Sequence, residues 1–211
     1  MPTVLLVRHA TTPTTGTRLY GRKRGVHIND AGIAQAEAAA AHLADTKLAA
    51  VYTSPMERAR ETAAIVARPH GIKPKVRAGL NEVDYGDWTD KTLVSLRKRK
   101  EWSVIQQTPS RFSFPGGESL LHASSRIAGA VEALAAAHKP KDTFVVVSHA
   151  DLIRMLIAHF SGTPLDMFQR LMVAPASVTT IHLAPGADPF VVSTNVIPKP
   201  LQAQPRKSSD A

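Results

Sequence analysis

The chain has 211 residues and no cysteine, which excludes disulfide bonds and thiolate metal sites. Hydrophobic residues make up 44% of it, which is typical of a globular protein and excludes a largely disordered chain. The formal net charge of +9 favours anionic partners, among them nucleic acids, acidic membranes and phosphorylated metabolites.

The sequence narrows these classes of partner further. No apolar run approaches the roughly 20 residues that span a bilayer, and the N-terminus enters a strand without an export signal, so we expect a cytoplasmic protein with no membrane partner. Aromatic residues make up only 5% and do not alternate with the basic clusters at 22–24 and 97–100, so we expect no nucleic-acid partner. Each basic cluster is either solvated surface or part of a rim that attracts a phosphorylated substrate. A homodimer is compatible with the sequence.

The first predicted element is a buried strand at 4–7, where four apolar residues follow one another. Arg8 and His9 come directly after it. In an open α/β sheet, ligands bind outside the carboxyl ends of the strands, which places His9 to act as a nucleophile and Arg8 to hold an anion. Taken alone, the pair fits a loop histidine beside a surface arginine equally well.

A loop at 11–29 follows, because this segment lacks hydrophobic periodicity and contains several glycines. We interpret it as an active-site loop, in which Thr15 and three other threonines offer hydroxyl groups. Asn29 or Asp30 then caps an alanine-rich helix that extends to about residue 44 and serves as scaffold.

The next predicted elements are a short strand at 48–53 and a helix that begins with a capping box. Ser54 is the expected N-cap, Pro55 suits the first helical position and Glu57 completes the box. Arg58 then lies in the first turn, where free backbone N–H groups favour anions. On the helix pattern alone, Arg58 fits better as an ordinary helix arginine paired with a neighbouring glutamate.

Two acidic residues leave the end of the next predicted strand, at 75–80. If the chain stays extended, alternation places Glu82 and Asp84 on the same side, and either carboxyl group could act as a general acid. Residues 90–114 contain a short basic helix at 93–102 and a polar loop, and such a segment could form a lid or a wall of the substrate site.

A second histidine follows a second buried strand. An amphipathic helix at 118–138 leads to a strand at 143–148, which delivers His149 in the same layout as His9. Two strands that each present a histidine at the same end predict a paired-histidine site. The polar tail at 198–211 is expected to be disordered. The remaining predicted elements are two helices and an edge hairpin, at 151–160, 164–172 and 177–183 with 190–195.

Five stretches of the sequence resemble, in order, the signature blocks of the histidine phosphatase superfamily, the phosphoglycerate mutase-like proteins. They are LVRH at 6–9, YTSPMERARETA at 52–63, NEVDYGDW at 81–88, PGGES at 115–119 and VSH at 147–149. The blocks span most of residues 3–183, and the resemblance is to the phosphatase branch. It implies an α/β fold, a three-layer sandwich whose mostly parallel central sheet has helices on both faces, in a single domain at 1–197.

The resemblance also implies roles for individual residues. His9 would form a phosphohistidine, Glu82 rather than Asp84 would be the proton donor, and His149 would be a further donor to phosphate. No metal ion or other cofactor is implied, because arginines replace the cation. The groups implied for phosphate binding are the side chains of Arg8, Arg58, Thr15 and Arg22 and the backbone N–H group of Ala150.

Three positions depart from the family pattern. Ala10 and Ala150 stand where glycine commonly follows each histidine, and alanine keeps the backbone N–H group without strain if φ is negative. Thr15 stands where the family often has asparagine, so a hydroxyl group would replace that contact. These departures bear on the identity of the substrate more than on the reaction.

We therefore expect a metal-independent phosphomonoesterase that hydrolyses a small phosphorylated metabolite through a phosphohistidine. One alternative is a phosphoglycerate mutase, although the segment at 85–102 does not resemble the longer segment that family mutases carry after the acid. Another is a non-catalytic protein that binds a phosphorylated ligand or nucleic acid, as the charge suggests. A metal held by His9 and His149 is a third, but there is no HExxH motif and no acidic cluster beside a histidine.

Overall fold

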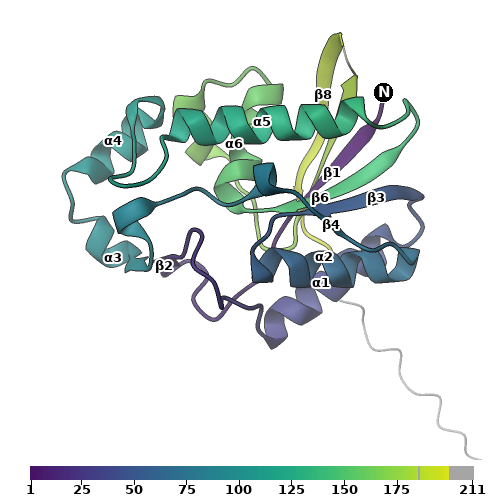
Figure 1. The fold of residues 1–211 in the computed structure, drawn as a ribbon, viewed down its shortest axis with the longest axis horizontal. Helices are drawn as coiled ribbons and strands as arrows, with labels where there is room; N and C mark the ends of the chain where they lie inside the picture. The colour runs from purple at the N-terminus through teal and green to yellow at the C-terminus, as the bar shows by residue number, and fades with distance from the viewer. Residues whose placement is uncertain (185, 200–211) are drawn as a thin grey trace, which may run out of the picture.

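A computed structural model describes residues 1–184 and 186–199 and is built around a six-stranded sheet (Figure 1). The strands lie in the order β4, β3, β6, β1, β7, β8. The four strands from β4 to β1 are parallel, whereas β7 and β8 form an antiparallel hairpin at one edge. The mostly parallel sheet and the edge hairpin are thus confirmed. The bounds are β1 Thr3–Arg8, β3 Leu48–Thr53, β4 Lys75–Val76, β6 Thr143–Ser148, β7 Val178–Ala184 and β8 Ala187–Val196.

The register of β1 and β6 brings the two predicted histidines together. Both strands are continuous apolar runs, which suits the centre of a sheet that is covered on both faces. Arg8 lies opposite Ser148 in the parallel pairing, so His9 and His149 leave the sheet side by side. The N–H group of His9 donates to the backbone oxygen of Ser148 at 2.9 Å, which extends the pairing by one bond.

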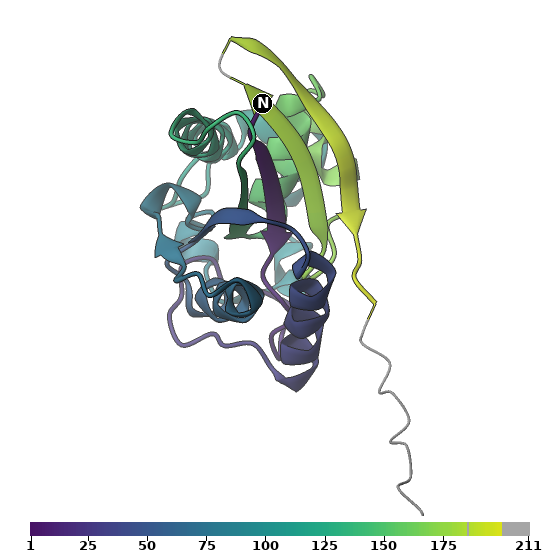
Figure 2. The same cartoon turned by 90° about the vertical axis from the view of Figure 1, so that its right-hand side faces the viewer.

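Two pairs of helices cover the sheet, one pair on each face (Figures 1 and 2). Alternate side chains of β1 point to opposite faces, so that Leu5 and Val7 join one buried cluster and Val4 and Leu6 join the other. This arrangement confirms the three-layer sandwich. The helices over Leu5 and Val7 are α1 (Asp30–Leu43) and α2 (Glu57–Ala67), and those on the opposite face are α5 (Leu120–Ala136) and α6 (Ala150–Phe160).

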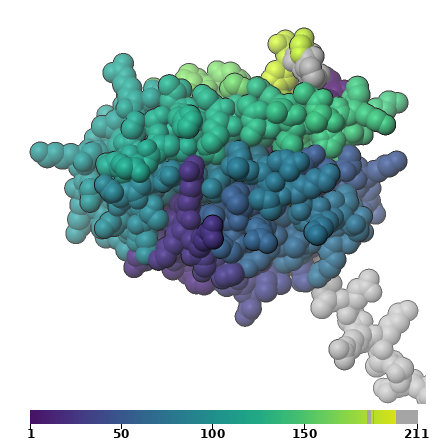
Figure 3. Space-filling model, in the orientation of Figure 1, coloured from purple at the N-terminus to yellow at the C-terminus, as the bar shows by residue number. Residues whose placement is uncertain are grey.

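A smaller unit lies beside the carboxyl ends of the parallel strands. Figure 3 shows it in teal, against the purple atoms of the loop that follows β1. Buried Trp88 stacks with Trp102 at 6.5 Å between ring centroids, so the segment at 90–114 is packed rather than loose. Its strands and helices are β2 (Arg18–Leu19), β5 (Lys91–Thr92), α3 (Leu93–Leu96) and α4 (Glu101–Gln107). The 3₁₀ helices are η1 (Arg68–His70), η2 (Ala78–Leu80), η3 (Gly86–Trp88), η4 (Pro109–Arg111) and η5 (Leu165–Arg170).

Four elements differ from the sequence prediction, among them the helix expected at 164–172, which is the 3₁₀ helix η5. The helix expected to begin with a Ser54 cap begins at Glu57, with Met56 as the N-cap residue, because Met56 is extended at φ −69° and ψ 140°; the Ser54 hydroxyl accepts from the N–H group of Met56 at 3.3 Å. The strand expected at 75–80 is only the two-residue β4, followed by η2. The single helix expected at 93–102 is two helices, α3 and α4, because a turn interrupts it.

Two sequence predictions concern the ends of the chain. The tail predicted at 198–211 lies outside the described residues apart from 198 and 199, so its disorder stays a prediction, as does the domain boundary at 197. Among the described residues, no helix has the length and apolar character needed to cross a membrane.

Candidate active site

His9 and His149 meet at the carboxyl ends of β1 and β6. Their ring centroids lie 5.3 Å apart, and the rings meet edge to face. The His9 Nδ1 atom lies 2.8 Å from the backbone oxygen of Ala10, and a carbonyl only accepts, so Nδ1 carries the proton. The Nε2 atom of His9 therefore has the lone pair that a nucleophile needs.

The surroundings of His9 favour neutral imidazole. The residue is 7% exposed. Burial lowers the pKa of His9 well below its ordinary value, and the charges of Arg58 and Arg8 lower it further. The ring is therefore unprotonated at neutral pH, which is the form that can attack phosphorus.

Two arginines bring unpaired donors to the same place. Arg58 lies in the first turn of α2, as predicted, and is buried. Its Nη2 donates to the backbone oxygen of Gly21 at 3.0 Å, and Arg8 Nη1 donates to that of Val173 at 2.7 Å. In the described part of the chain, Arg58 Nη1 and Arg8 Nε are buried without a partner. Buried donors are normally paired, so these two N–H groups are suited to an anion such as phosphate.

His149 is fully buried beside Arg58. Its Nδ1 lies 3.2 Å from Arg58 Nη2, which can only donate, so Nδ1 accepts and Nε2 carries the proton. Nε2 then donates to the Ser54 hydroxyl oxygen at 2.8 Å. Burial lowers the pKa of His149 well below its ordinary value, and the Arg58 charge adds to this. His149 thus orients Arg58, while its donation to phosphate stays a prediction.

Glu82 completes this cluster. Its Oε1 atom accepts from the N–H group of Val83 at 2.9 Å, and Oε2 lies 3.3 Å from His149 Nδ1 and 3.6 Å from Arg58 Nη2. Burial raises the pKa of Glu82 to about 7, although the charge of Arg58 opposes the rise. A carboxyl group with this pKa can both donate and accept a proton near neutrality.

Asp84 and Arg22 point away from the cluster. The Asp84 carboxylate pairs with Arg22 at 3.2 Å and accepts from the N–H group of Gly86 at 3.1 Å. A cavity of about 530 Å³ adjoins the site, and Glu82 lines it whereas Asp84 and Arg22 do not. The geometry therefore supports Glu82 as the acid. Arg22, expected at the phosphate, is instead held by Asp84 and Glu118, so it does not reach the cavity.

The cavity contains the other predicted phosphate ligands. Arg8, Arg58, Thr15 and Ala150 line it together with His9. The N–H group of Ala150 lies at the N-terminus of α6, where backbone donors lack intrahelical partners. The Thr15 hydroxyl oxygen accepts from a backbone N–H group of its own loop at 2.8 Å. The chain therefore presents these groups to one pocket, although their roles stay predictions.

The two alanines that depart from the family pattern are not strained. Neither Ala10 nor Ala150 is among the residues with positive φ. The N–H group of Ala10 donates to the Thr62 hydroxyl oxygen at 3.0 Å, whereas that of Ala150 lies at the start of α6. Alanine thus supplies both backbone donors at these positions without cost from its Cβ atom.

The sequence interpretation missed several polar residues of the site, and three of them contact or adjoin its central groups. Ser54 holds His149, and Asp151 and Arg154 line the cavity from α6. The Ser54 segment matched a helix cap, and no local pattern pointed to a distant histidine. Arg154 lies four residues after Ala150, and this helical spacing was a signal that places both on one face.

Comparisons with known proteins identify the family of this chain. Residues 4–196 match the family model described as "Histidine phosphatase superfamily (branch 1)". The chain belongs to the histidine phosphatase superfamily. The match confirms the resemblance that the five sequence blocks carry, and the sheet and its helices agree with that assignment.

Two relatives and one solved structure are similar to this chain over most of its length. Phosphoserine phosphatase 1 of Hydrogenobacter thermophilus is 26% identical over 87% of this chain and 87% of its own. Bifunctional protein Rv2228c of Mycobacterium tuberculosis is 32% identical over 73% of this chain, which matches only 43% of that relative. The structure of Bacillus stearothermophilus YhfR has 28% identity and a TM-score of 0.86, over 93% of this chain and 98% of its own.

Proposed function

We propose that this protein is a phosphomonoesterase that hydrolyses small phosphorylated metabolites without a metal ion, through a phosphohistidine at His9. The observation that carries the proposal is a neutral His9, protonated on Nδ1, beside two arginines whose buried N–H groups have no partner among the described residues. Membership of the histidine phosphatase superfamily and the relative named phosphoserine phosphatase 1 support it. The cavity volume of about 530 Å³ suits a small molecule.

In the first step, Nε2 of His9 attacks phosphorus and the bond between phosphorus and the ester oxygen breaks. Arg8 and Arg58 bind the equatorial oxygens, and the N–H group of Ala150 adds a donor at the positive end of α6. Glu82 gives its proton to the leaving oxygen. Because the pKa of Glu82 is about 7, its protonated form is populated at neutral pH.

In the second step, the Glu82 carboxylate takes a proton from a water molecule that attacks the phosphohistidine. The bond between phosphorus and Nε2 breaks, which regenerates neutral His9 and releases inorganic phosphate. Glu82 is protonated again at the end of the cycle, so one carboxyl group serves as acid and then as base.

Activity is expected to persist after metal ions are removed. Two arginines already supply positive charge, and within residues 1–184 and 186–199 no group of three His, Asp or Glu side chains is arranged to hold a cation. The measurement is phosphate release from an aryl phosphate after dialysis against a chelator. Unchanged kcat supports the proposal, whereas a loss that only an added divalent ion restores contradicts it.

Phosphate release and a second assay, phosphoryl exchange, separate the alternative functions. A protein that binds the aryl phosphate without cleaving it would be a binding protein. Phosphoryl exchange between 2- and 3-phosphoglycerate that outpaces phosphate release would identify a mutase.

The cysteine-free composition supports a further proposal, that the protein works in the reducing cytoplasm. A homodimer and the absence of a nucleic-acid partner are also proposed on sequence grounds.

A further inference from the structure

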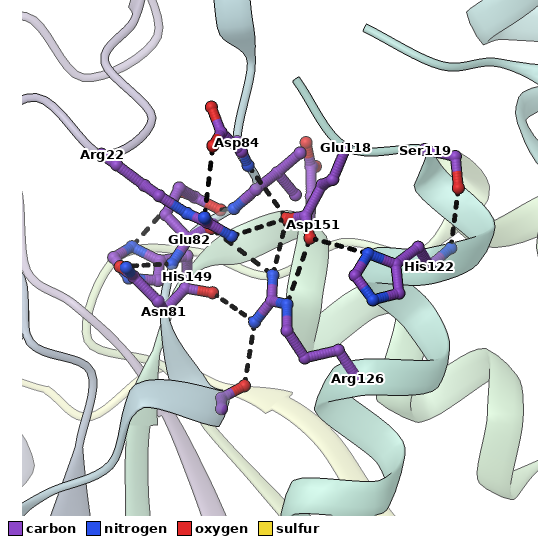
Figure 4. A network of polar contacts seen from close by, with 12 residues as sticks. Arg22, Asn81, Glu82, Asp84, Glu118, Ser119, His122, Arg126, His149 and Asp151 are labelled. Atoms are coloured by element: carbon purple, nitrogen blue, oxygen red, sulfur yellow. Dashed lines mark hydrogen bonds and ion pairs between the residues drawn. The ribbon is translucent and has the colours of Figure 1, made fainter. Parts of the chain in front are cut away.

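The segment that carries Glu82 is held by side chains from distant parts of the chain (Figure 4). Between η2 and η3 it belongs to neither a helix nor a strand, so regular backbone bonding does not fix it. Arg22 from the loop after β1, Glu118 from the turn before α5 and Arg126 from α5 supply the missing partners.

Arg126 and Arg22 bond the carbonyl groups of this segment. Arg126 Nη1 donates to the backbone oxygens of Gly79 and Asn81, both at 2.9 Å, and Nη2 lies 3.5 Å from that of Glu82. Arg22 Nε donates to the same Glu82 oxygen at 2.9 Å. Two guanidinium groups therefore fix the peptide group of the proposed acid.

Glu118 joins the two arginines. Its side chain is 8% exposed, and Oε1 lies 2.7 Å from Arg126 Nη2 and 3.1 Å from Arg22 Nη2. The same oxygen accepts from the N–H group of Asp84 at 2.9 Å, which fixes the chain on the other side of Glu82. Burial alone would raise the pKa of Glu118, but the bonds to Arg126 and Asp84 outweigh it, so the pKa lies below its ordinary value. The carboxylate thus stays charged between its partners.

A close backbone contact keeps Glu118 next to this segment. Gly86 has a φ of 49°, and a Cβ atom there would stand 2.1 Å from the backbone oxygen of Pro115. The N–H group of Asp87 donates to that oxygen at 2.8 Å. Only glycine permits this approach, so the turn at 115–118 and the segment after Glu82 form one unit.

We propose that Glu118 and Arg126 are positioning residues for the proton donor, an inference that rests on the proposed function. Neither lines the cavity, so their effect on the reaction must pass through Glu82. A general acid must lie within hydrogen-bond reach of the leaving oxygen, and a displacement of about 1 Å can cost about 10²-fold in rate. The positioning matters most for substrates whose leaving group needs the proton.

The test is Arg126→Met, which keeps the aliphatic stem and removes the donors to the segment. Single-turnover rates are measured with an alkyl phosphate, which needs the proton, and with a nitrophenyl phosphate, which leaves largely unaided. The alkyl rate is expected to fall by about 10- to 10²-fold and the nitrophenyl rate far less. Arg126→Lys should recover part of the alkyl rate. The matched control is Glu132→Gln, an exposed residue of α5 outside the network, which should change neither rate.

The ratio of the two rates decides the outcome. An equal loss on both substrates, or an unchanged alkyl rate, overturns the inference, because a merely structural role does not distinguish leaving groups. If the unmodified protein hydrolyses neither substrate, the proposed function fails before any variant is compared. If Arg126→Met does not fold, Glu118→Gln tests the same point, since it keeps the volume but removes the charge that holds both arginines.

A separate observation concerns the cavity wall beyond the phosphate ligands. Arg154 lies one helical turn after Ala150 in α6, and both residues line the cavity. Arg154 Nη1 donates to Asp151 Oδ1 at 3.1 Å, while its Nε atom is buried without a partner in the described residues. This unpaired buried donor is the feature that also marks the two phosphate-site arginines.

The chemistry of this donor indicates what Arg154 binds. A guanidinium N–H group can only donate and carries positive charge, so it pairs best with an anionic oxygen. Within the described residues, Asp151 accepts from Nη1, and the buried Nε donor is left for a second anion. The phosphate group has its own arginines, Arg8 and Arg58, in the same cavity.

We infer that the alcohol part of the substrate carries a second anionic group, such as a carboxylate, that binds Arg154; this too rests on the proposed function. The test compares the phosphate ester of a hydroxy acid with that of the matching neutral alcohol. A charge-assisted bond of this kind predicts a kcat/KM preference of about 10- to 10²-fold for the hydroxy-acid ester. Arg154→Met should remove the preference by raising KM for the hydroxy-acid ester far more than for the neutral ester.

The exposed Arg170→Met serves as the matched control and should keep the preference. Equal kcat/KM values for the two esters in the unmodified protein overturn the inference while leaving the phosphatase intact. A loss in Arg154→Met that is equal for both esters overturns it as well, because a specificity residue must discriminate.

Discussion

Replacing His9 by alanine is expected to lower kcat by at least about 10⁴-fold and to leave the fold intact. Nε2 of His9 is the atom that attacks phosphorus. The other imidazole of the pair, His149, cannot take over, because its Nε2–H group is bonded to Ser54. The fold is preserved because the His9 ring bonds its own neighbour, Ala10, rather than a distant element.

The measurement combines single-turnover phosphate release with thermal unfolding. His42→Ala, which removes an exposed histidine of α1, is the matched control and should keep both the rate and the Tm. Substantial turnover by folded His9→Ala protein would exclude His9 as the nucleophile.

Glu82→Gln is expected to slow hydrolysis of an alkyl phosphate by about 10²–10⁴-fold, and that of a nitrophenyl phosphate far less. An alkoxide needs protonation as the bond breaks, whereas nitrophenolate departs largely unaided. Asp84→Asn is the matched control, because Asp84 pairs with Arg22 and does not line the cavity. The burst rate must be measured, since slow dephosphorylation could mask the contrast in steady-state kcat. Leaving-group dependence in Asp84→Asn but not in Glu82→Gln would reverse the assignment.

The ionisation of Glu82 should also determine how kcat/KM depends on pH. Glu82 donates only when protonated, and its pKa is about 7, so kcat/KM for an alkyl phosphate should fall above about pH 7. The fall is expected to approach about tenfold per pH unit, as for loss of one essential proton. Glu82→Gln should lack this alkaline limb, because an amide does not titrate. A limb that persists in the variant would belong to another group.

The sequence could predict which residues come together where the buried parallel strands end. Uninterrupted apolar runs at 4–7 and 144–147 predicted central parallel strands, and such strands deliver His9 and His149 to one edge of the sheet. Arg58 was placed in the first turn of a helix, and the structure agrees even though the helix starts at Glu57. The expected start of this helix was wrong by two residues because Met56 is extended, and the local pattern gave no sign that Ser54 also binds the distant His149 ring.

The choice between the two carboxyl groups depended on tertiary contacts. Alternation assumed that the chain stays extended at 81–84, but β4 ends at Val76 and irregular backbone follows. Arg22 then draws Asp84 outward, whereas Glu82 stays buried beside Arg58. Only the resemblance to the histidine phosphatase superfamily distinguished the two residues in advance, because the network that separates them joins residues about a hundred positions apart.

The most direct test of the central claim is to trap the covalent intermediate. A phosphate ester with a radiolabelled phosphoryl group is mixed with the enzyme, quenched within one turnover in alkaline denaturant, and the labelled peptide is identified. The account predicts an acid-labile label on His9, formed at least as fast as steady-state turnover. Label on another residue, or product release with no protein-bound label at any time in the turnover, would contradict it.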